Sequence, residues 1–93
     1  MTTTFKPIEK EDIAHLIFPA TDVLTDKHEI LQRKQDLERA MAMGNTDQVK
    51  IEIFFEDDTN QLVTNTTVWA VTPEHLVLKK GVTIPVNRIY RII

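Results

Sequence analysis

Between residues 49 and 71 the chain reads VKIEIFFEDDTNQLVTNTTVWAV, a run in which apolar and polar side chains alternate at its start. The alternating apolar positions are Val49, Ile51, Ile53 and Phe55. A period of two residues predicts a strand that is buried on one face. Residues 57–60, Asp-Asp-Thr-Asn, have the composition of a turn. Residues 61–71 are rich in threonine and valine, which predicts a second, long strand.

Three shorter strands are expected further along the chain, at residues 75–79, 82–86 and 89–93. Pro85 has no amide hydrogen to donate, so its strand should have an unpaired edge. The strand at 61–71 is long enough to bend and serve two sheets, and closure would remove edges that invite aggregation. We therefore expect an α+β, mostly β domain in which residues 49–93 form a five-stranded, strongly bent antiparallel sheet or small barrel.

The strongest helix signal lies before these strands, at residues 26–43, DKHEILQRKQDLERAMAM. Good helix formers fill the segment, and Asp26, or alternatively Thr25, can cap its first turn. Gly44 and Asn45 supply a left-handed stop. The apolar stripe consists of Ile30, Leu37 and Met41. Such a helix should place one face on the sheet and expose the other.

The N-terminal part of the chain carries weaker signals. Residues 1–10 have no hydrophobic period and are expected to be poorly ordered. Residues 11–16 could form one or two helical turns, ended before Pro19 because the residue preceding a proline avoids the helical region. The whole chain, residues 1–93, is expected to be a single domain, which suits its length.

The composition argues against catalysis. The chain has neither cysteine nor serine, which removes disulfides, thiolate ligands and the commonest nucleophiles. His15, His28 and His75 lie in different predicted elements without metal-ligand spacing. The acidic residues 56–58 sit at a hairpin tip, where a solvated turn is favoured over a cation site or an acid/base pair. We expect no catalytic residue, no metal and no cofactor, and therefore not an enzyme.

Charge and hydropathy bear on partner and location. The net charge is −3, from 11 basic and 14 acidic residues. Residues 1–47 hold 6 basic and 9 acidic groups, whereas residues 48–93 hold 5 of each. Neither half has the basic surplus of non-specific nucleic-acid binding, although a local basic patch remains open. Without a signal peptide or an apolar run long enough to span a bilayer, a cytoplasmic location and no membrane contact are expected.

The strand half, residues 49–92, closes with Ile-Pro-Val-Asn-Arg-Ile and resembles the small Sm-like barrel family. Within that group it looks most like the bacterial Rof-type modulators of the transcription terminator Rho. Those proteins open with an aromatic-x-Pro-Ile stretch followed by acidic residues, and Phe5-Lys6-Pro7-Ile8-Glu9-Lys10-Glu11-Asp12 is similar. The resemblance implies an Sm-like fold and a non-catalytic regulator of transcription that binds a protein, with Rho as an implied partner. A bacterial family that shares only the barrel is the alternative.

Candidate partner-binding residues form two charged groups. The acidic group, which could meet a basic protein surface, consists of Glu9, Glu11 and Asp12. The basic and aromatic group, which could bind single-stranded RNA, consists of Lys79, Lys80, Arg88, Tyr90 and Trp69. A solvated strand edge blunted by lysine is the favoured alternative for the basic group.

Two aromatic residues and one strand edge leave further alternatives. Trp69 is expected mainly in the core, with a contact surface as the alternative. Phe54 falls on the polar face of its strand, where packing under the helix is favoured over a partner-binding spot. Self-association through the Pro85 edge is a third functional reading, so the oligomeric state stays open. Binding of a protein partner is the favoured function, and binding of RNA comes second.

Overall fold

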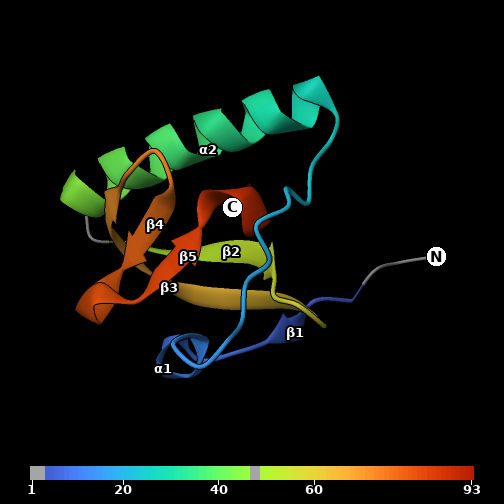
Figure 1. The fold of residues 1–93 in the computed structure, drawn as a ribbon. Coiled ribbons are helices and arrows are strands. Elements are labelled where there is room, and N and C mark those ends of the chain that lie inside the picture. Colours follow the sequence, from blue (N-terminus) through green and yellow to red (C-terminus); the bar gives the residue numbers. More distant parts are fainter. Residues whose placement is uncertain (1–3, 47–48) are drawn as a thin grey trace.

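The computed structural model describes residues 4–46 and 49–93 (Figure 1). In chain order its helices and strands are β1 (Lys6–Pro7), α1 (Lys10–Ile13), α2 (Lys27–Thr46), β2 (Lys50–Glu56), β3 (Gln61–Val71), β4 (His75–Leu78), β5 (Thr83–Pro85) and β6 (Ile89–Ile92). Two short 3₁₀ turns, η1 (Lys79–Gly81) and η2 (Val86–Arg88), flank β5. No helix within the described ranges has both the length and the apolar character needed to cross a bilayer.

The main strands form an antiparallel sheet in the order β5-β4-β3-β2-β6. The long strand β3 is shared between neighbours: Gln61 to Thr67 pair with β2, and Val68 to Val71 pair with β4. The predicted five-stranded antiparallel sheet behind a helix is therefore confirmed, and so is the α+β, mostly β character. Strands β2 to β5 follow chain order, whereas β6 returns to pair with β2. The short strand β1, which pairs in parallel with β3 at Leu62 and Val63, was not expected.

The sheet remains open, and the prediction of a closed small barrel is wrong. Strands β5 and β6 lie at opposite ends of the strand order and are not paired with each other. The segment before α2 instead binds the turn η2 that joins them. The Val23 amide donates to the Asn87 carbonyl at 2.9 Å, and the Asn87 side chain donates to the Ala20 carbonyl at 2.5 Å. A closed barrel would pair β5 with β6. In this structure the loop before α2 instead forms hydrogen bonds to η2, the turn that joins those two strands.

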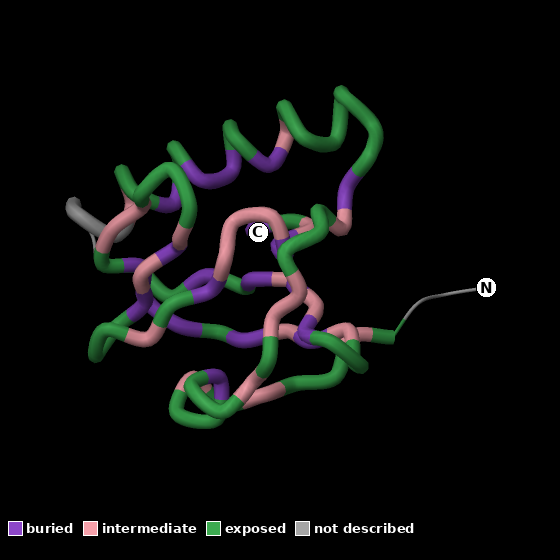
Figure 2. The backbone as a smooth tube through the Cα atoms, in the orientation of Figure 1, coloured by how far each residue is buried: buried purple, intermediate pink, exposed green. Residues whose placement is uncertain are grey.

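The core lies between the bent sheet, α2 and the N-terminal segment (Figure 2). Burial alternates along β2, with Ile51, Ile53 and Phe55 inside, as its two-residue period predicts. Ile13 of α1 is buried in the same cluster, and the ring of Phe18 lies 6.2 Å from that of Phe55. The segment before α2 therefore contributes Ile13 to the core and packs Phe18 against it.

Helix α2 begins where its cap was expected but ends later. The His28 amide donates to the Asp26 carboxylate at 2.7 Å, which confirms the Asp26 cap. Because the helix continues to Thr46, the predicted stop at Gly44 and Asn45 is wrong. A glycine and an asparagine cost helix stability without forbidding the conformation.

The buried stripe of α2 is also rotated from the predicted one. Of the predicted stripe, Leu37 is buried, whereas Ile30 and Met41 are 38% and 41% exposed. The side chains that α2 does bury are Arg33, Asp36, Leu37 and Ala40. The core-facing side of α2 therefore includes two charged residues, Arg33 and Asp36. The apolar residues Ile30 and Met41 lie outside this buried side.

The sequence indicated little order in residues 1–10, and the structure places a packed segment in part of that range. Residues 1–3 lie outside the described residues. The ring of Phe5 packs edge-on against Phe54 at 5.1 Å and against Tyr90 at 5.6 Å. The expectation that α2 covers Phe54 is therefore corrected, because Phe5 packs on it.

Candidate interaction surfaces

Strand β6 has an outer edge that could bind a partner strand, but side chains of α2 already occupy it. Arg33 Nη1 donates to the Ile89 carbonyl at 3.1 Å, and Arg39 Nη2 donates to the Ile92 carbonyl at 2.6 Å. The Ile92 amide donates to Asp36 Oδ2 at 3.1 Å. Because edge groups left unpaired invite intermolecular pairing, these bonds remove β6 as a docking edge.

The charges that reach β6 are paired within the fold. Arg33 makes two bonds of 2.8 Å to Asp22, and these bonds lower the pKa of the Asp22 carboxyl below its ordinary value. Asp36, with 0% exposure, also accepts from Arg91 Nε at 2.9 Å and Gln32 Nε2 at 3.0 Å. Burial alone raises the pKa of Asp36, but its hydrogen bonds, led by that of the Ile92 amide, outweigh burial and lower it.

Arg88 was a predicted RNA contact, but it is 4% exposed and serves the fold. Its guanidinium donates to the carbonyls of Asp57 and Thr21, at 3.0 and 2.7 Å, and lies 3.3 Å from a Glu56 carboxylate oxygen. The Tyr90 hydroxyl donates to the same carboxylate. Burial and the neighbouring Glu56 raise the pKa of Tyr90. Arg88 of η2 and Tyr90 of β6 therefore bond to the end of β2, and Arg88 also bonds to the turn that follows it.

That turn is less solvated than its sequence indicated. Asp57 is buried, and its Oδ1 accepts from the amides of Thr59 and Asn60 at 2.9 and 2.6 Å. The turn itself is as predicted, because aspartate favours turns by bonding its own backbone two residues on. Asp58 is exposed.

Three exposed acidic residues line a hollow over the outer face of β2 and β3. Its volume is about 420 Å³, and its charged lining residues are Glu9, Asp12 and Glu52. Pro7, Ile8, Val63, Thr64 and Asn65 complete the lining. All three carboxylates are exposed, and none forms an ion pair with a residue in 4–46 or 49–93. We call this feature the acidic hollow.

The third predicted acidic residue, Glu11, is not part of the acidic hollow. Its carboxylate pairs with Lys10 Nζ at 3.3 Å. Its own backbone amide and Lys10 lower its pKa, and the charge of Lys80 contributes. Across the described residues, no group of His, Cys, Asp or Glu side chains is close enough to hold a metal ion.

Trp69 lies on the surface, so the expectation that it is in the core is wrong. The register of β3 against β4 shifts between Val68 and Ala70, and Trp69 lies at that bulge. Val68 stays buried while Trp69 is 53% exposed, since a bulge redirects the side chain that it contains. Lys79 and Lys80 are exposed in η1, which directly follows the β4 residue paired with Val68.

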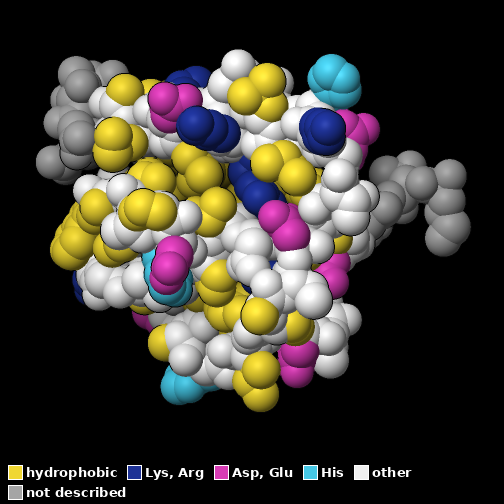
Figure 3. All heavy atoms as spheres, turned by 45° about the horizontal axis from the view of Figure 1, so that its top comes forward, with side chains coloured by type: hydrophobic (Ala, Val, Ile, Leu, Met, Phe, Trp, Pro, Cys, Tyr) yellow, Lys and Arg dark blue, Asp and Glu magenta, His cyan; other side chains and the backbone are white. Residues whose placement is uncertain are grey.

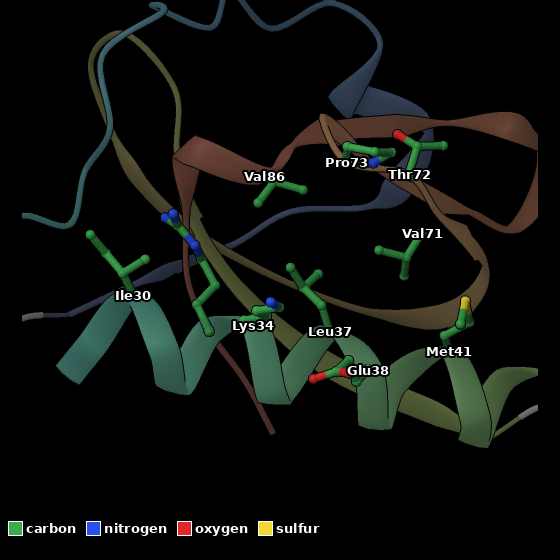
Figure 4. A pocket seen from close by; sticks show the side chains of 10 residues that line it. Ile30, Lys34, Leu37, Glu38, Met41, Val71, Thr72, Pro73 and Val86 are labelled. Atoms are coloured by element: carbon green, nitrogen blue, oxygen red, sulfur yellow. The ribbon is translucent and has the colours of Figure 1, made fainter. Parts of the chain in front are cut away.

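An apolar groove runs between α2 and the turn joining β3 to β4, with a volume of about 470 Å³. Its lining residues are Ile30, Arg33, Lys34, Leu37, Glu38, Met41, Val71, Thr72, Pro73 and Val86. In Figure 4, Leu37 and Val71 point toward each other across the groove. Figure 3 shows hydrophobic side chains gathered beside α2, with charged ones above them on the helix. No sequence argument indicated this groove.

The structure thus places the predicted partner-binding residues in groups that differ from the predicted ones. Glu9 and Asp12 lie together with Glu52, which is forty residues from Asp12 in the chain. Arg88 and Tyr90 belong to the fold. No protein-family model, curated protein or solved structure matches the chain.

Proposed function

We propose that this chain is a non-catalytic interaction domain that binds a protein partner through the acidic hollow. The observation that carries the proposal is the convergence of Glu9, Asp12 and Glu52 on one hollow without partners among the described residues. Unpaired carboxylates around a concave surface attract a basic partner and orient it as it docks. Val63 and Ile8 add apolar contact area inside the same rim.

The resemblance to Rof-type proteins supports the same part of the chain. The acidic residues after the Phe-x-Pro-Ile opening include Glu9 and Asp12 of the hollow. A Rho-type termination factor is therefore the partner to test first. In this proposal Glu11 has a smaller part, because Lys10 offsets its charge.

Perturbed carboxylates often mark active sites, and in this chain they serve the fold instead. Asp22 and Asp36 have lowered pKa values, and each is bonded to an arginine and to a backbone amide. Neither lines the acidic hollow. Together with a sequence that has no serine or cysteine, this favours binding over catalysis.

The test compares two triple variants of equal charge. The first, Glu9→Gln/Asp12→Asn/Glu52→Gln, neutralises the acidic hollow. The second, Glu29→Gln/Asp58→Asn/Glu74→Gln, neutralises exposed acids elsewhere. Calorimetric titration with a purified Rho-type factor and with an oligo-lysine peptide should show at least a tenfold loss of affinity for the first variant only. Equal losses in both variants would mean that net charge alone governs binding.

Trp69 supports a second candidate function, the binding of single-stranded RNA. Trp69 is exposed at the β3 bulge, and Lys79 and Lys80 are exposed in η1, which follows the β4 residue paired with Val68. A tryptophan offers a stacking surface, and lysines offer phosphate contacts. Trp69 is the only tryptophan in the chain, so its fluorescence reports on stacking directly. Titration with a labelled oligonucleotide at low salt should quench this emission, and salt should reverse the effect. Unchanged emission and anisotropy would remove this candidate.

A further inference from the structure

The exposed side of α2 carries a stripe that points to a partner other than that of the acidic hollow. Its residues, spaced along the groove, are Ile30, Lys34, Glu38 and Met41. The apolar ends of the stripe are 38% and 41% exposed, although apolar helix residues usually face the core. Lys34 and Glu38 form no ion pair with any residue in 4–46 or 49–93.

The order of apolar and charged residues along this stripe makes it complementary to the same stripe of a second copy of the chain. When two α2 helices run antiparallel about a two-fold axis between Gln35 and Asp36, Ile30 of one copy lies opposite Met41 of the other. Lys34 then lies within one residue of the position opposite Glu38, a difference of about 1.5 Å along the helix. The symmetry repeats both contacts, as an interface between identical surfaces requires.

We infer that two copies of this chain associate through α2 and the adjoining groove, in antiparallel orientation. Met41 of each copy lies against Ile30 of the other at the groove mouth, and Lys34 pairs with Glu38 across the axis. A parallel arrangement fails because it places Lys34 against Lys34 and Glu38 against Glu38. Val71 and Pro73 on the far wall of the groove extend the contact area beyond the helix.

The strand edges do not provide an equivalent surface. The edge of β6 is bonded to Arg33, Asp36 and Arg39 of the same chain. The outer strand β5 has three residues and ends at Pro85, which has no amide hydrogen to offer a neighbouring strand. Of the surfaces considered for self-association, α2 is therefore the one that the contacts favour.

The expected dimer is weak because the contact is short. Ile30 and Met41 are eleven residues apart, or about 16 Å along the helix. Interfaces of this length lie at the small end of the range and accompany transient association. We expect a dissociation constant on the order of 10 µM.

Charge exchange between Lys34 and Glu38 tests the arrangement. In sedimentation equilibrium from about 1 to 500 µM, wild-type chain should dimerise and Lys34→Glu should weaken dimerisation at least tenfold. The double variant Lys34→Glu/Glu38→Lys exchanges the charges and should restore it. Circular dichroism checks that each variant is folded. A wild-type monomer at the highest concentration, or a double variant as weak as the single one, would overturn the inference.

Directed cross-linking tests the register independently of affinity. Because the chain has no cysteine, Ile30→Cys and Met41→Cys each introduce a single thiol. Mixing the two variants under oxidising conditions should give the heterodimer disulfide faster than either variant forms its homodimer. Faster homodimer formation would contradict the antiparallel register. Neither experiment involves Glu9, Asp12 or Glu52, so the result is separate from the test of the acidic hollow.

Discussion

At the scale of single residues, the buried carboxylate of Asp36 joins α2 to β6. Its carboxylate accepts hydrogen bonds from Gln32 on α2 and from the Arg91 side chain and Ile92 amide on β6. The sequence placed this residue on a solvated helix face, because its partners on β6 lie more than fifty residues away. The sequence feature that indicates burial of Asp36 is its spacing from Leu37 and Ala40, which places all three residues on the buried side of α2.

Replacing Asp36 should therefore be costly. We expect Asp36→Ala to lower the free energy of unfolding by about 2 kcal/mol, because it leaves the buried Ile92 amide without its acceptor. The lost pairing with Arg91 adds less, since that side chain is half exposed. The control is Gln35→Ala at the adjacent exposed position, which should change the same quantity by less than about 0.5 kcal/mol. Urea unfolding measures both variants. Similar values for the two would show that the Asp36 contacts contribute little.

Trp69 supplies a second test at this scale. Because 53% of the residue is exposed, Trp69→Ala should lower the free energy of unfolding by less than about 1 kcal/mol, whereas a core tryptophan would lose 3–5 kcal/mol. The native emission should already be that of an indole in water, and unfolding should shift it little. A blue-shifted native emission would place Trp69 back in the core. The exposure of Trp69 could not be predicted from the sequence, because a β-bulge leaves no clear signature in an alternating strand.

At the scale of elements, the β2–β3 hairpin was the most predictable part. The bounds of β3 agree with the sequence at Gln61 and Val71, because alternation, β-propensity and an Asp-Asp-Thr-Asn turn all indicate the same register. The N-terminus of α2 was predictable from Asp26 for the same local reason. Strand β1 was not, since two residues carry no period and depend on an edge of β3.

Phe5 should hold β1 against the sheet. Its ring packs on Phe54 and Tyr90, and a hydrogen bond from the Ile8 amide to the Val63 carbonyl, 2.9 Å long, continues the attachment. We expect Phe5→Ala to accelerate hydrogen exchange at Ile8 at least tenfold, while exchange in β2 changes little. Thr4→Ala, at the exposed preceding position, is the control. If Ile8 remains protected in Phe5→Ala, another contact holds the N-terminal segment.

At the scale of the whole molecule, the sheet stays open, and contacts other than strand pairing cover its β6 edge and the η2 junction. Helix side chains bond the edge of β6, and the segment before α2 bonds the junction between β5 and β6. The sequence indicated that the sheet edges need to be covered. It did not indicate whether strands or side chains cover them, because Arg33 and Asp36 look like surface charges until β6 is placed beside them.

The same reasoning explains how much of the candidate site was predictable. Glu9 and Asp12 were identified from the sequence, because an acidic run after an apolar opening is visible locally. Glu52 was not, because it reads as an ordinary outward position of β2 and acquires meaning only when the N-terminal segment crosses above it. The contacts of Arg88 and Tyr90 with Glu56 could not be predicted, because Glu56 lies more than thirty residues earlier in the chain.

Acid should destabilise the whole domain through the hydrogen-bonded carboxylates of Asp22 and Asp36. The pKa values of Asp22 and Asp36 are lowered in the folded state. Their stabilising contribution is therefore complete above the pKa of an unfolded aspartate, about 3.9, and is lost as the pH falls below it. Urea midpoints from pH 7 to pH 2 should fall mainly below about pH 4. The decline should be shallower for Asp36→Asn, and an unchanged slope in that variant would contradict this assignment.

The central claim, that the acidic hollow is the docking surface, is tested most directly by nuclear magnetic resonance. A ¹⁵N-labelled chain is titrated with the oligo-lysine peptide at low salt. We expect the amide shifts to concentrate at residues 8–12, 52 and 63–65, and to disappear in Glu9→Gln/Asp12→Asn/Glu52→Gln. Shifts spread evenly over all exposed acids, or concentrated around Trp69 or α2, would contradict the claim.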